Sequence, residues 1–199
     1  MNLQKPRIIL VGGGGHCKAC IDVIEAQNMY EIYGILDVEK NIGKRLLSYK
    51  IIGTDDDIPE LVNDVHQFFI TVGQIESNKI RVRIFNAIKN AEAFLPLIIS
   101  PTAYVSKHSD IGGGSIIMHH ALVNASAEIG ENCIINNKAL VEHDVEIGNH
   151  CHISTGAILN GGVKVGDNCF IGSGSVIKQG VVIAPNSFIK ANSFIKANL

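Results

Sequence analysis

Residues 129–147 read IGENCIINNKALVEHDVEI, and this stretch sets the architecture of the second half of the chain. A branched aliphatic residue stands at every sixth position: Ile129, Ile135, Val141 and Ile147. The same step of six continues without a break from Ile99 to Ile195. A helical interpretation fails, because a period of six is not a multiple of the 3.6 residues in a helical turn.

A second, small residue accompanies each aliphatic. The position two residues earlier holds small side chains, such as Cys133 before Ile135 and Ala139 before Val141. Residues two apart point to the same side of a short strand, so both side chains enter one interior. Glycine follows the aliphatic with a period of 18, at Gly112, Gly130, Gly148 and Gly166. The pattern predicts a three-sided solenoid of hexapeptides, with coils stacked at about 4.8 Å.

The chain has five cysteines, an odd number that argues against a disulfide framework. Cys133, Cys151 and Cys169 are 18 residues apart in the small interior position, so we expect them to stack as packing residues. Cys17 and Cys20 match the C-x-x-C redox pattern, but they lie in a predicted helix without a second cysteine pair. A redox or metal role for them is therefore disfavoured.

Residues 1–95 alternate between predicted strands and helices. The expected elements are a strand at 7–11, a helix at 17–28, strands at 32–37 and 68–73, and a helix at 77–89. Such alternation is typical of a parallel βαβ sheet. The sequence predicts a Rossmann-like α/β domain at 1–95, followed by an all-β parallel β-helix domain at 96–199.

A glycine-rich turn joins the first predicted strand to its helix. Gly12-x-Gly14-x-x-Cys17 has cysteine where the dinucleotide fingerprint has its third glycine or alanine, and Asp37 follows about 20 residues later. Backbone N–H groups in such a turn can approach a phosphate at the helix N-terminus. Nucleotide binding is one interpretation, and a turn kept only for tight packing is the other.

Two histidines of the predicted solenoid are candidate functional residues. His143 follows the interior Val141 by two positions, which places it at an outward-facing corner beside Asp144. Neutral imidazole next to a carboxylate suits general-base catalysis, although a solvated corner residue would fit the same pattern. His152 directly precedes an interior residue and should project outward from a flat face. If chains associate side by side, His143 of one chain could face His152 of its neighbour.

Composition limits the partners and the location. The formal net charge is −2, so no basic face is expected for nucleic acid or anionic membrane. The N-terminal stretch lacks the features of a signal peptide, and no apolar run is long enough to span a membrane. We therefore expect a cytoplasmic protein.

Several motifs together resemble a known family. They are Val11-Gly-Gly-Gly-Gly-His16, Thr71-Val-Gly-Gln74, Ile98-Ile-Ser-Pro-Thr102 and Glu142-His-Asp-Val-Glu-Ile-Gly148. They resemble the NeuD/PglD family of sugar acetyltransferases, which includes sialic acid O-acetyltransferases and UDP-4-amino-sugar N-acetyltransferases. The resemblance implies a left-handed β-helix, a homotrimer with active sites between subunits, direct transfer from acetyl-CoA, and no metal.

The resemblance also implies roles for individual residues. The family's general base matches His143, and the acid that modulates this base matches Asp144. Its acetyl-CoA contacts match His152, Gly161, Ser173 and Ala191. Its acceptor-binding residues match Gly14, Gly15, His16, Asp37, Gly73 and Asn136.

The sequence leaves several alternatives open. The acceptor group is an amine or a hydroxyl, on a nucleotide-linked 4-amino-sugar or on a sialic-type acid, and another acyl donor would also fit. A zinc-dependent β-helix enzyme resembling a carbonic anhydrase would draw its ligands from His119, His120, His143, His150 and His152. A non-catalytic scaffold that binds sugar nucleotides is the third interpretation.

Overall fold

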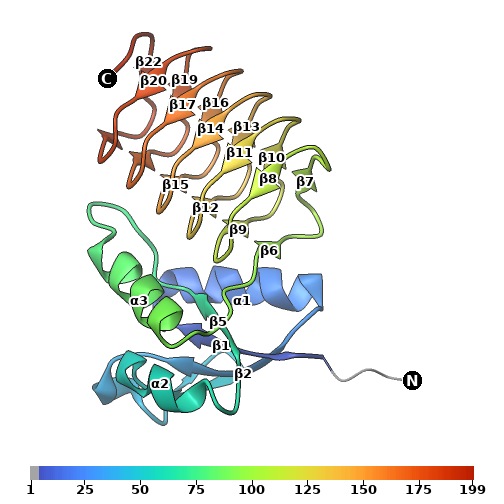
Figure 1. Cartoon of the computed structure of the whole chain (residues 1–199), viewed down its shortest axis with the longest axis vertical. Coiled ribbons are helices and arrows are strands. Elements are labelled where there is room, and N and C mark those ends of the chain that lie inside the picture. Colours follow the sequence, from blue (N-terminus) through green and yellow to red (C-terminus); the bar gives the residue numbers. More distant parts are fainter. Residues whose placement is uncertain (1–4) are drawn as a thin grey trace. The chain divides into compact units, whose positions relative to one another are not determined.

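The computed structural model describes residues 5–199 and contains two compact units (Figure 1). The N-terminal unit comprises the chain up to Gly73 together with Lys79–Pro96. The second unit comprises Leu97–Leu199 and also the short segment Gln74–Asn78. The sequence had suggested one division between residues 95 and 96, and it gave no sign that Gln74–Asn78 leaves the N-terminal unit. None of the helices in the described part is long and apolar enough to span a membrane.

The N-terminal unit is built on a five-stranded sheet with the order β3-β4-β2-β1-β5. Its strands are β1 (Arg7–Val11), β2 (Glu31–Leu36), β3 (Arg45–Leu46), β4 (Tyr49–Gly53) and β5 (Gln67–Ile70). β1 pairs in parallel with both β2 and β5, which confirms the predicted βαβ arrangement. The sequence patterns did not predict β4, or the antiparallel β3 at the edge.

Helices cover both faces of this sheet (Figure 1). They are α1 (Gly15–Gln27), α2 (Ile58–Leu61) and α3 (Lys79–Asn90), with 3₁₀ turns η1 (Glu39–Asn41) and η2 (Asp55–Asp57). Side chains alternate along β1, as a strand requires. Ile9 and Val11 join a core with residues of α2 and α3, and Ile8 and Leu10 are buried on the opposite face.

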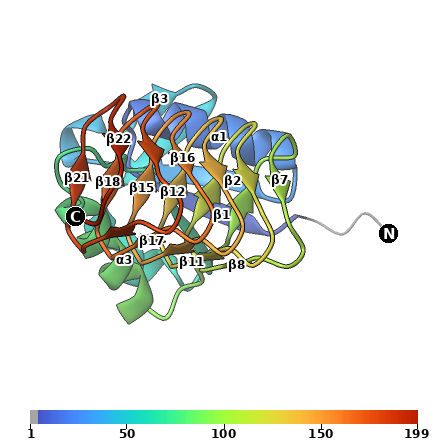
Figure 2. The same cartoon turned by 90° about the horizontal axis from the view of Figure 1, so that it is seen from above.

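The second unit is a parallel β-helix of two-residue strands in three sheets, which run side by side along the helix in Figure 2. The first sheet contains β6 (Ile98–Ile99), β9 (Ile116–Ile117), β12 (Ile134–Ile135), β15 (His152–Ile153), β18 (Phe170–Ile171) and β21 (Phe188–Ile189). The second contains β7 (Tyr104–Val105), β10 (Leu122–Val123), β13 (Leu140–Val141), β16 (Ile158–Leu159), β19 (Val176–Ile177) and β22 (Phe194–Ile195). The third contains β8 (Asp110–Ile111), β11 (Glu128–Ile129), β14 (Glu146–Ile147), β17 (Lys164–Val165) and β20 (Val182–Ile183).

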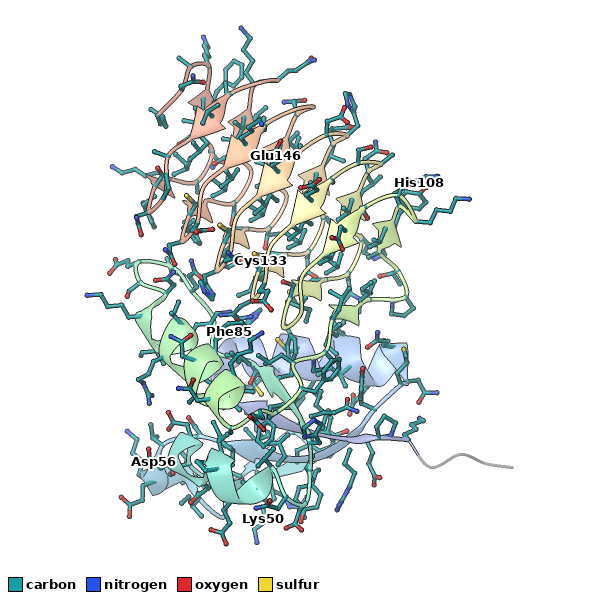
Figure 3. All side chains as sticks on the ribbon, in the orientation of Figure 1. Lys50, Asp56, Phe85, His108, Cys133 and Glu146 are labelled. Atoms are coloured by element: carbon teal, nitrogen blue, oxygen red, sulfur yellow. The ribbon has the colours of Figure 1, made fainter. Side chains whose placement is uncertain are left out.

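The interior of the β-helix has the predicted composition. The aliphatics from Ile117 to Ile189 are buried together with the small residues between them. Cys133, Cys151 and Cys169 form the expected column, in which the N–H of each later cysteine lies 3.4 Å from the Sγ of the one before (Cys133 is labelled in Figure 3). All five cysteines are buried and free of disulfides.

The outward residues of the three sheets differ in character. The third sheet presents a charged face with Asp110, Glu128, Glu146 and Lys164, in which Glu146 and Lys164 form a 2.7 Å ion pair. The second sheet presents what we call the apolar face: Tyr104, Leu122, Leu140, Ile158, Val176 and Phe194. The first and last of these side chains are exposed and the four between them are only partly buried. The apolar face therefore lacks a cover within the described chain.

The turns between strands have a repeated backbone conformation. One residue of nearly every turn has a positive φ, and it recurs with the period of six at Asn132, Lys138, Asp144, His150 and Asn168 and at glycines such as Gly156 and Gly162. Asparagine, aspartate and glycine tolerate this left-handed conformation better than other residues do. The choice of asparagine, aspartate or glycine at these turn positions therefore follows from backbone conformation and not from burial in the interior.

The glycines with a period of 18 are required by close stacking of the coils. A Cβ on Gly130 would lie 2.8 Å from the backbone N of Asn149 in the next coil. We expect Gly130→Ala to lower the free energy of unfolding by about 2–3 kcal/mol, because backbone must move to admit the methyl group. Urea denaturation at a fixed protein concentration measures this.

Gly156→Asn is the matched control for Gly130→Ala. Gly156 has a φ of +65° with open space around it, and Asn132 and Asn168 occupy equivalent corners. We expect a change within about 0.5 kcal/mol for this variant. Equal destabilisation by the two substitutions would show that coil stacking is not what requires glycine at position 130.

Candidate active site

His143 lies in the turn after β13 and forms a pair with the adjacent Asp144. Its Nδ1 is 2.7 Å from Oδ2 of Asp144, and the two side chains are 57% and 64% exposed. Because a carboxylate accepts, Nδ1 carries the hydrogen and Nε2 keeps its lone pair. The hydrogen bond to Asp144 raises the pKa of His143; slight desolvation opposes this, and the charges of Asp144 and Glu142 add to it.

The neighbours of the pair explain its geometry. Asp144 has a φ of 60°, the left-handed corner conformation, which places its carboxylate beside the ring. In the next coil, a Cβ on Gly161 would lie 2.6 Å from Cε1 of His143. Gly161 was predicted as a coenzyme contact. Its lack of a side chain makes room for the imidazole of His143. Glu142 is held by the amide of Asn124 at 2.9 Å.

We expect Asp144→Asn to move the acid limb of the pH profile of kcat/KM to lower pH. A general base is active when neutral, so activity rises as pH passes its pKa, and loss of the carboxylate lowers the pKa of His143. Asparagine fits the left-handed corner and can still accept the bond from Nδ1. Steady-state rates across pH measure the limb, with Glu128→Gln on the charged face as control. An unmoved acid limb would contradict this role of Asp144.

His152 projects outward as predicted, but other residues cover it. It leaves the outer side of β15, but it is only 6% exposed, because Gln74 contacts its ring and the ring of Phe170 packs against it, with 5.2 Å between the centroids. Its Nδ1 donates to the carbonyl of Gln74 at 2.6 Å. Its Nε2 lies 3.1 Å from Nδ2 of Asn136, whose Oδ1 accepts the N–H of Asn137 at 2.7 Å. His152 is therefore a neutral Nδ1–H tautomer with both ring nitrogens in use, and in this form it cannot donate to an oxyanion.

The predicted residues of the β-helix fall on two edges. Turns after the first sheet carry Asn136, Ser173 and Ala191, which we call the Asn136 edge. Turns after the second sheet carry His143, Asp144 and Gly161, which we call the His143 edge. The hydroxyls of Ser173 and Ser154 are 2.9 Å apart on the Asn136 edge. The apolar face lies between the two edges, so within one chain His143 and His152 are on different sides, as predicted.

The acceptor residues predicted in the N-terminal unit gather at the carboxyl end of its sheet. β1 has β2 on one side and β5 on the other, which makes this end a topological switch point, where α/β sheets bind ligands. A Cβ on Gly13 would lie 2.7 Å from Oδ2 of Asp37, and one on Gly73 would lie 3.3 Å from Cβ of His16. The fold thus brings the glycine loop, Asp37 and Gly73 together.

The four positions of the glycine loop differ in whether packing requires glycine there. Gly12 has a φ of +112° and abuts Val72, and Gly13 abuts Asp37, so packing requires both. Gly14 and Gly15 are exposed and have open space where a Cβ would stand. Tight packing therefore accounts for half of the loop only. Gly14 and Gly15, by contrast, leave the chain at the start of α1 exposed, with no packing reason for glycine.

The remaining candidates do not form a second site. Burial raises the pKa of the Cys17 thiol to about 11, and it also raises the pKa of Cys20, so neither is a reactive thiolate. Within residues 5–199, no three side chains of histidine, cysteine, aspartate or glutamate are close enough together to hold a metal ion. The five histidines of the zinc interpretation are thus dispersed along a single chain.

Comparison with known proteins places the chain in a family. The family model described as the PglD N-terminal domain matches residues 7–88, and that of the bacterial transferase hexapeptide repeat matches residues 126–161 and 162–197. No curated protein sequence matches the chain.

Solved structures match over the whole chain. PerB from Caulobacter crescentus, solved with CoA and GDP-perosamine, is 28% identical with a TM-score of 0.91, covering 100% of this chain and 93% of PerB. The acetyltransferase domain of PglB from Neisseria gonorrhoeae, in complex with acetyl coenzyme A, is 26% identical with a TM-score of 0.90, covering 98% and 93%. WeeI from Acinetobacter baumannii shares the fold at 17% identity and a TM-score of 0.74, covering 96% of each chain.

These matches and the three stacked sheets confirm the predicted fold, a Rossmann-like α/β domain followed by a left-handed β-helix. The two family models together match most of the chain, and both relatives with more than a quarter of their residues identical match its full architecture. The chain therefore belongs to the hexapeptide-repeat sugar acetyltransferases of the PglD/NeuD type.

Proposed function

We propose that this enzyme transfers the acetyl group of acetyl-CoA to an amino group of a nucleotide-linked sugar, with His143 as the general base. The observation that carries the proposal is the His143–Asp144 pair: both side chains are exposed at an edge of the β-helix, and the carboxylate takes Nδ1 of His143, which leaves Nε2 as the proton acceptor. The relatives add the substrate class, because PerB was solved with CoA and GDP-perosamine and PglB with acetyl-CoA.

The chemistry requires one proton acceptor and no covalent enzyme intermediate. Nε2 of His143 takes a proton from the acceptor amine as its nitrogen attacks the thioester carbonyl carbon of acetyl-CoA. The tetrahedral intermediate collapses by breaking the C–S bond, and the imidazolium returns its proton to the CoA sulfur. Backbone N–H groups, rather than the occupied His152, are the donors available to the oxyanion.

The N-terminal unit supplies the acceptor site in this proposal. The exposed Gly14 and Gly15 stand at the N-terminus of α1, where the helix dipole favours a diphosphate. A diphosphate-linked sugar fits this site better than a free sialic-type acid does. An amine is preferred to a hydroxyl, because the perosamine enzyme is an N-acetyltransferase. The proposal includes a cytoplasmic enzyme that acts in the synthesis of bacterial polysaccharide precursors.

A homotrimer completes the site. The apolar face, with Leu122, Leu140, Ile158 and Val176 along its centre, lies between the His143 edge and the Asn136 edge. Packing this face around a threefold axis brings the His143 edge of one chain against the Asn136 edge of its neighbour. The acetyl-CoA contacts expected at His152, Ser173 and Ala191 then lie opposite the base across the subunit border.

The test is thiol release from acetyl-CoA by the purified protein. The acceptors are GDP-perosamine, UDP-linked 4-amino-sugars, sialic-type acids and their CMP forms. We expect turnover with one amine-bearing nucleotide sugar. Turnover with a sialic-type acid would change the acceptor class and retain the base. No turnover together with no binding of CoA would overturn the proposed function.

A further inference from the structure

A buried hydroxyl just after β5 forms a hydrogen bond to the glycine loop. Thr71 is 0% exposed, and its Oγ1 donates to the carbonyl of Gly12 at 2.6 Å. Its backbone N–H donates to the carbonyl of Val11 at 2.8 Å. Two adjacent bonds thus join the segment after β5 to the point where the glycine loop begins.

A buried arginine holds the same segment from its other side. Arg81 of α3 is 1% exposed, and its Nη1 donates to the carbonyls of Ile70 at 2.8 Å and Val72 at 2.9 Å. β5 is an edge strand, and residues two apart direct their carbonyls to the same side. The guanidinium therefore donates to the two edge carbonyls that another strand would otherwise pair with. Burial of this charge is costly unless it is hydrogen-bonded, so the contact is specific.

The segment held in this way forms one wall of the acceptor crevice. Val72 stands against Gly12, and a Cβ on Gly12 would lie 2.9 Å from the backbone N of Val72. The next residue, Gly73, lies against His16 at the start of α1. A shift of Thr71 or Val72 would consequently move both the loop and Gly73.

We propose that Thr71 and Arg81 are positioning residues for the acceptor: they hold the Gly12–His16 loop and Gly73 in the geometry that binds it, without touching it. The proposal rests on the proposed function, in which this loop is the acceptor site. It assigns a role to two buried polar residues that the acetyl-transfer chemistry at His143 does not use.

Thr71→Val and Thr71→Ser are the matched pair for the test. Valine keeps the shape and removes the hydroxyl, so the Gly12 carbonyl loses its partner, whereas serine keeps the bond. With GDP-perosamine, or whichever acceptor turns over, we expect the acceptor KM to rise about tenfold for the valine variant and less than about twofold for serine. The KM for acetyl-CoA and kcat should stay within about twofold in both variants. A purely structural role would not separate the two KM values.

Hydrogen exchange in the ligand-free protein tests the same idea without a substrate. Amides of residues 12–17 should exchange at least several-fold faster in Thr71→Val than in the wild type or in Thr71→Ser. Arg81→Met should do the same, with Arg83→Met as its control, because the side chain of Arg83 is 61% exposed and forms an ion pair with Asp55. Exchange identical to the wild type in Thr71→Val would overturn the proposal, whichever acceptor the enzyme uses.

Gly14→Ala separates this proposal from the proposed function. The position has room for the methyl group, so the variant should fold, while the added group lies where the acceptor would approach. An unchanged acceptor KM in Gly14→Ala would show that the acceptor site itself is misplaced. A raised acceptor KM in Gly14→Ala with wild-type behaviour of Thr71→Val would overturn only the positioning role.

Discussion

Replacing His143 by alanine is expected to lower kcat for acetyl transfer by about 10²–10⁴-fold. Nε2 of His143 is the proton acceptor in the proposed reaction, and alanine provides none. The side chain is exposed, so its removal leaves no cavity in the β-helix and the unfolding midpoint should change little. Thiol release in the presence of acceptor measures the rate, and calorimetry with CoA measures binding.

His108→Ala is the matched control, since His108 is an exposed turn residue at the rim of an earlier coil (labelled in Figure 3). We expect wild-type rates for this variant. A loss of less than about threefold in His143→Ala, with binding intact, would mean that another group accepts the proton. The pH profile of the same variant would then identify the range in which that group titrates.

Mixing His143→Ala with His152→Ala is expected to give more activity than the mean of the two separate variants if the site is shared between subunits. His143→Ala removes the base on one edge, and His152→Ala alters the Asn136 edge that faces the neighbour's base in the proposed trimer. In randomly mixed trimers, about a quarter of the subunit borders combine an intact His143 with an intact His152. Co-refolded mixtures should therefore regain up to about a quarter of the wild-type rate.

The apolar face provides the control for this complementation. Ile158→Arg places a charge at its centre, so we expect monomers in light scattering and no recovery on mixing. Glu128→Arg makes a similar change on the charged face and should leave the trimer intact. If mixed His143→Ala and His152→Ala trimers form but show no more activity than the mean of the separate variants, the two histidines do not belong to a site between subunits.

For His152, the direction of the side chain could be predicted from the sequence, but its contacts could not. A residue before an interior aliphatic points outward from a strand, and His152 does so. The cover supplied by Gln74 comes from 78 residues earlier in the chain, and no local pattern records that contact. The tautomer of His152 is also decided there, because the Gln74 carbonyl accepts from Nδ1 while Asn136 occupies Nε2.

For the glycine loop, the position in the chain could be predicted, but the packing of each glycine could not. Its place between a strand and a helix follows from sequence, since β1 and α1 are local patterns. Packing requires Gly12 and Gly13 but not Gly14 and Gly15 because Val72 and Asp37, which follow β5 and β2, lie against the first two. The positions of Thr71 and Arg81 in the sequence do not predict their contacts either, because each side chain donates a hydrogen bond to a backbone carbonyl elsewhere in the chain.

The sequence by itself determined the β-helix, its interior and the corner position of His143, because a step of six repeats one local geometry in every coil and hydrophobic burial selects its inward side. It also determined the alternating strands and helices around the glycine loop. The tertiary structure alone decided which face of the β-helix stays uncovered, that Gln74 contacts His152, and that Arg81 donates to the carbonyls at the edge of β5. Those features depend on hydrogen bonds and packing between residues far apart in sequence, which periodicity does not encode.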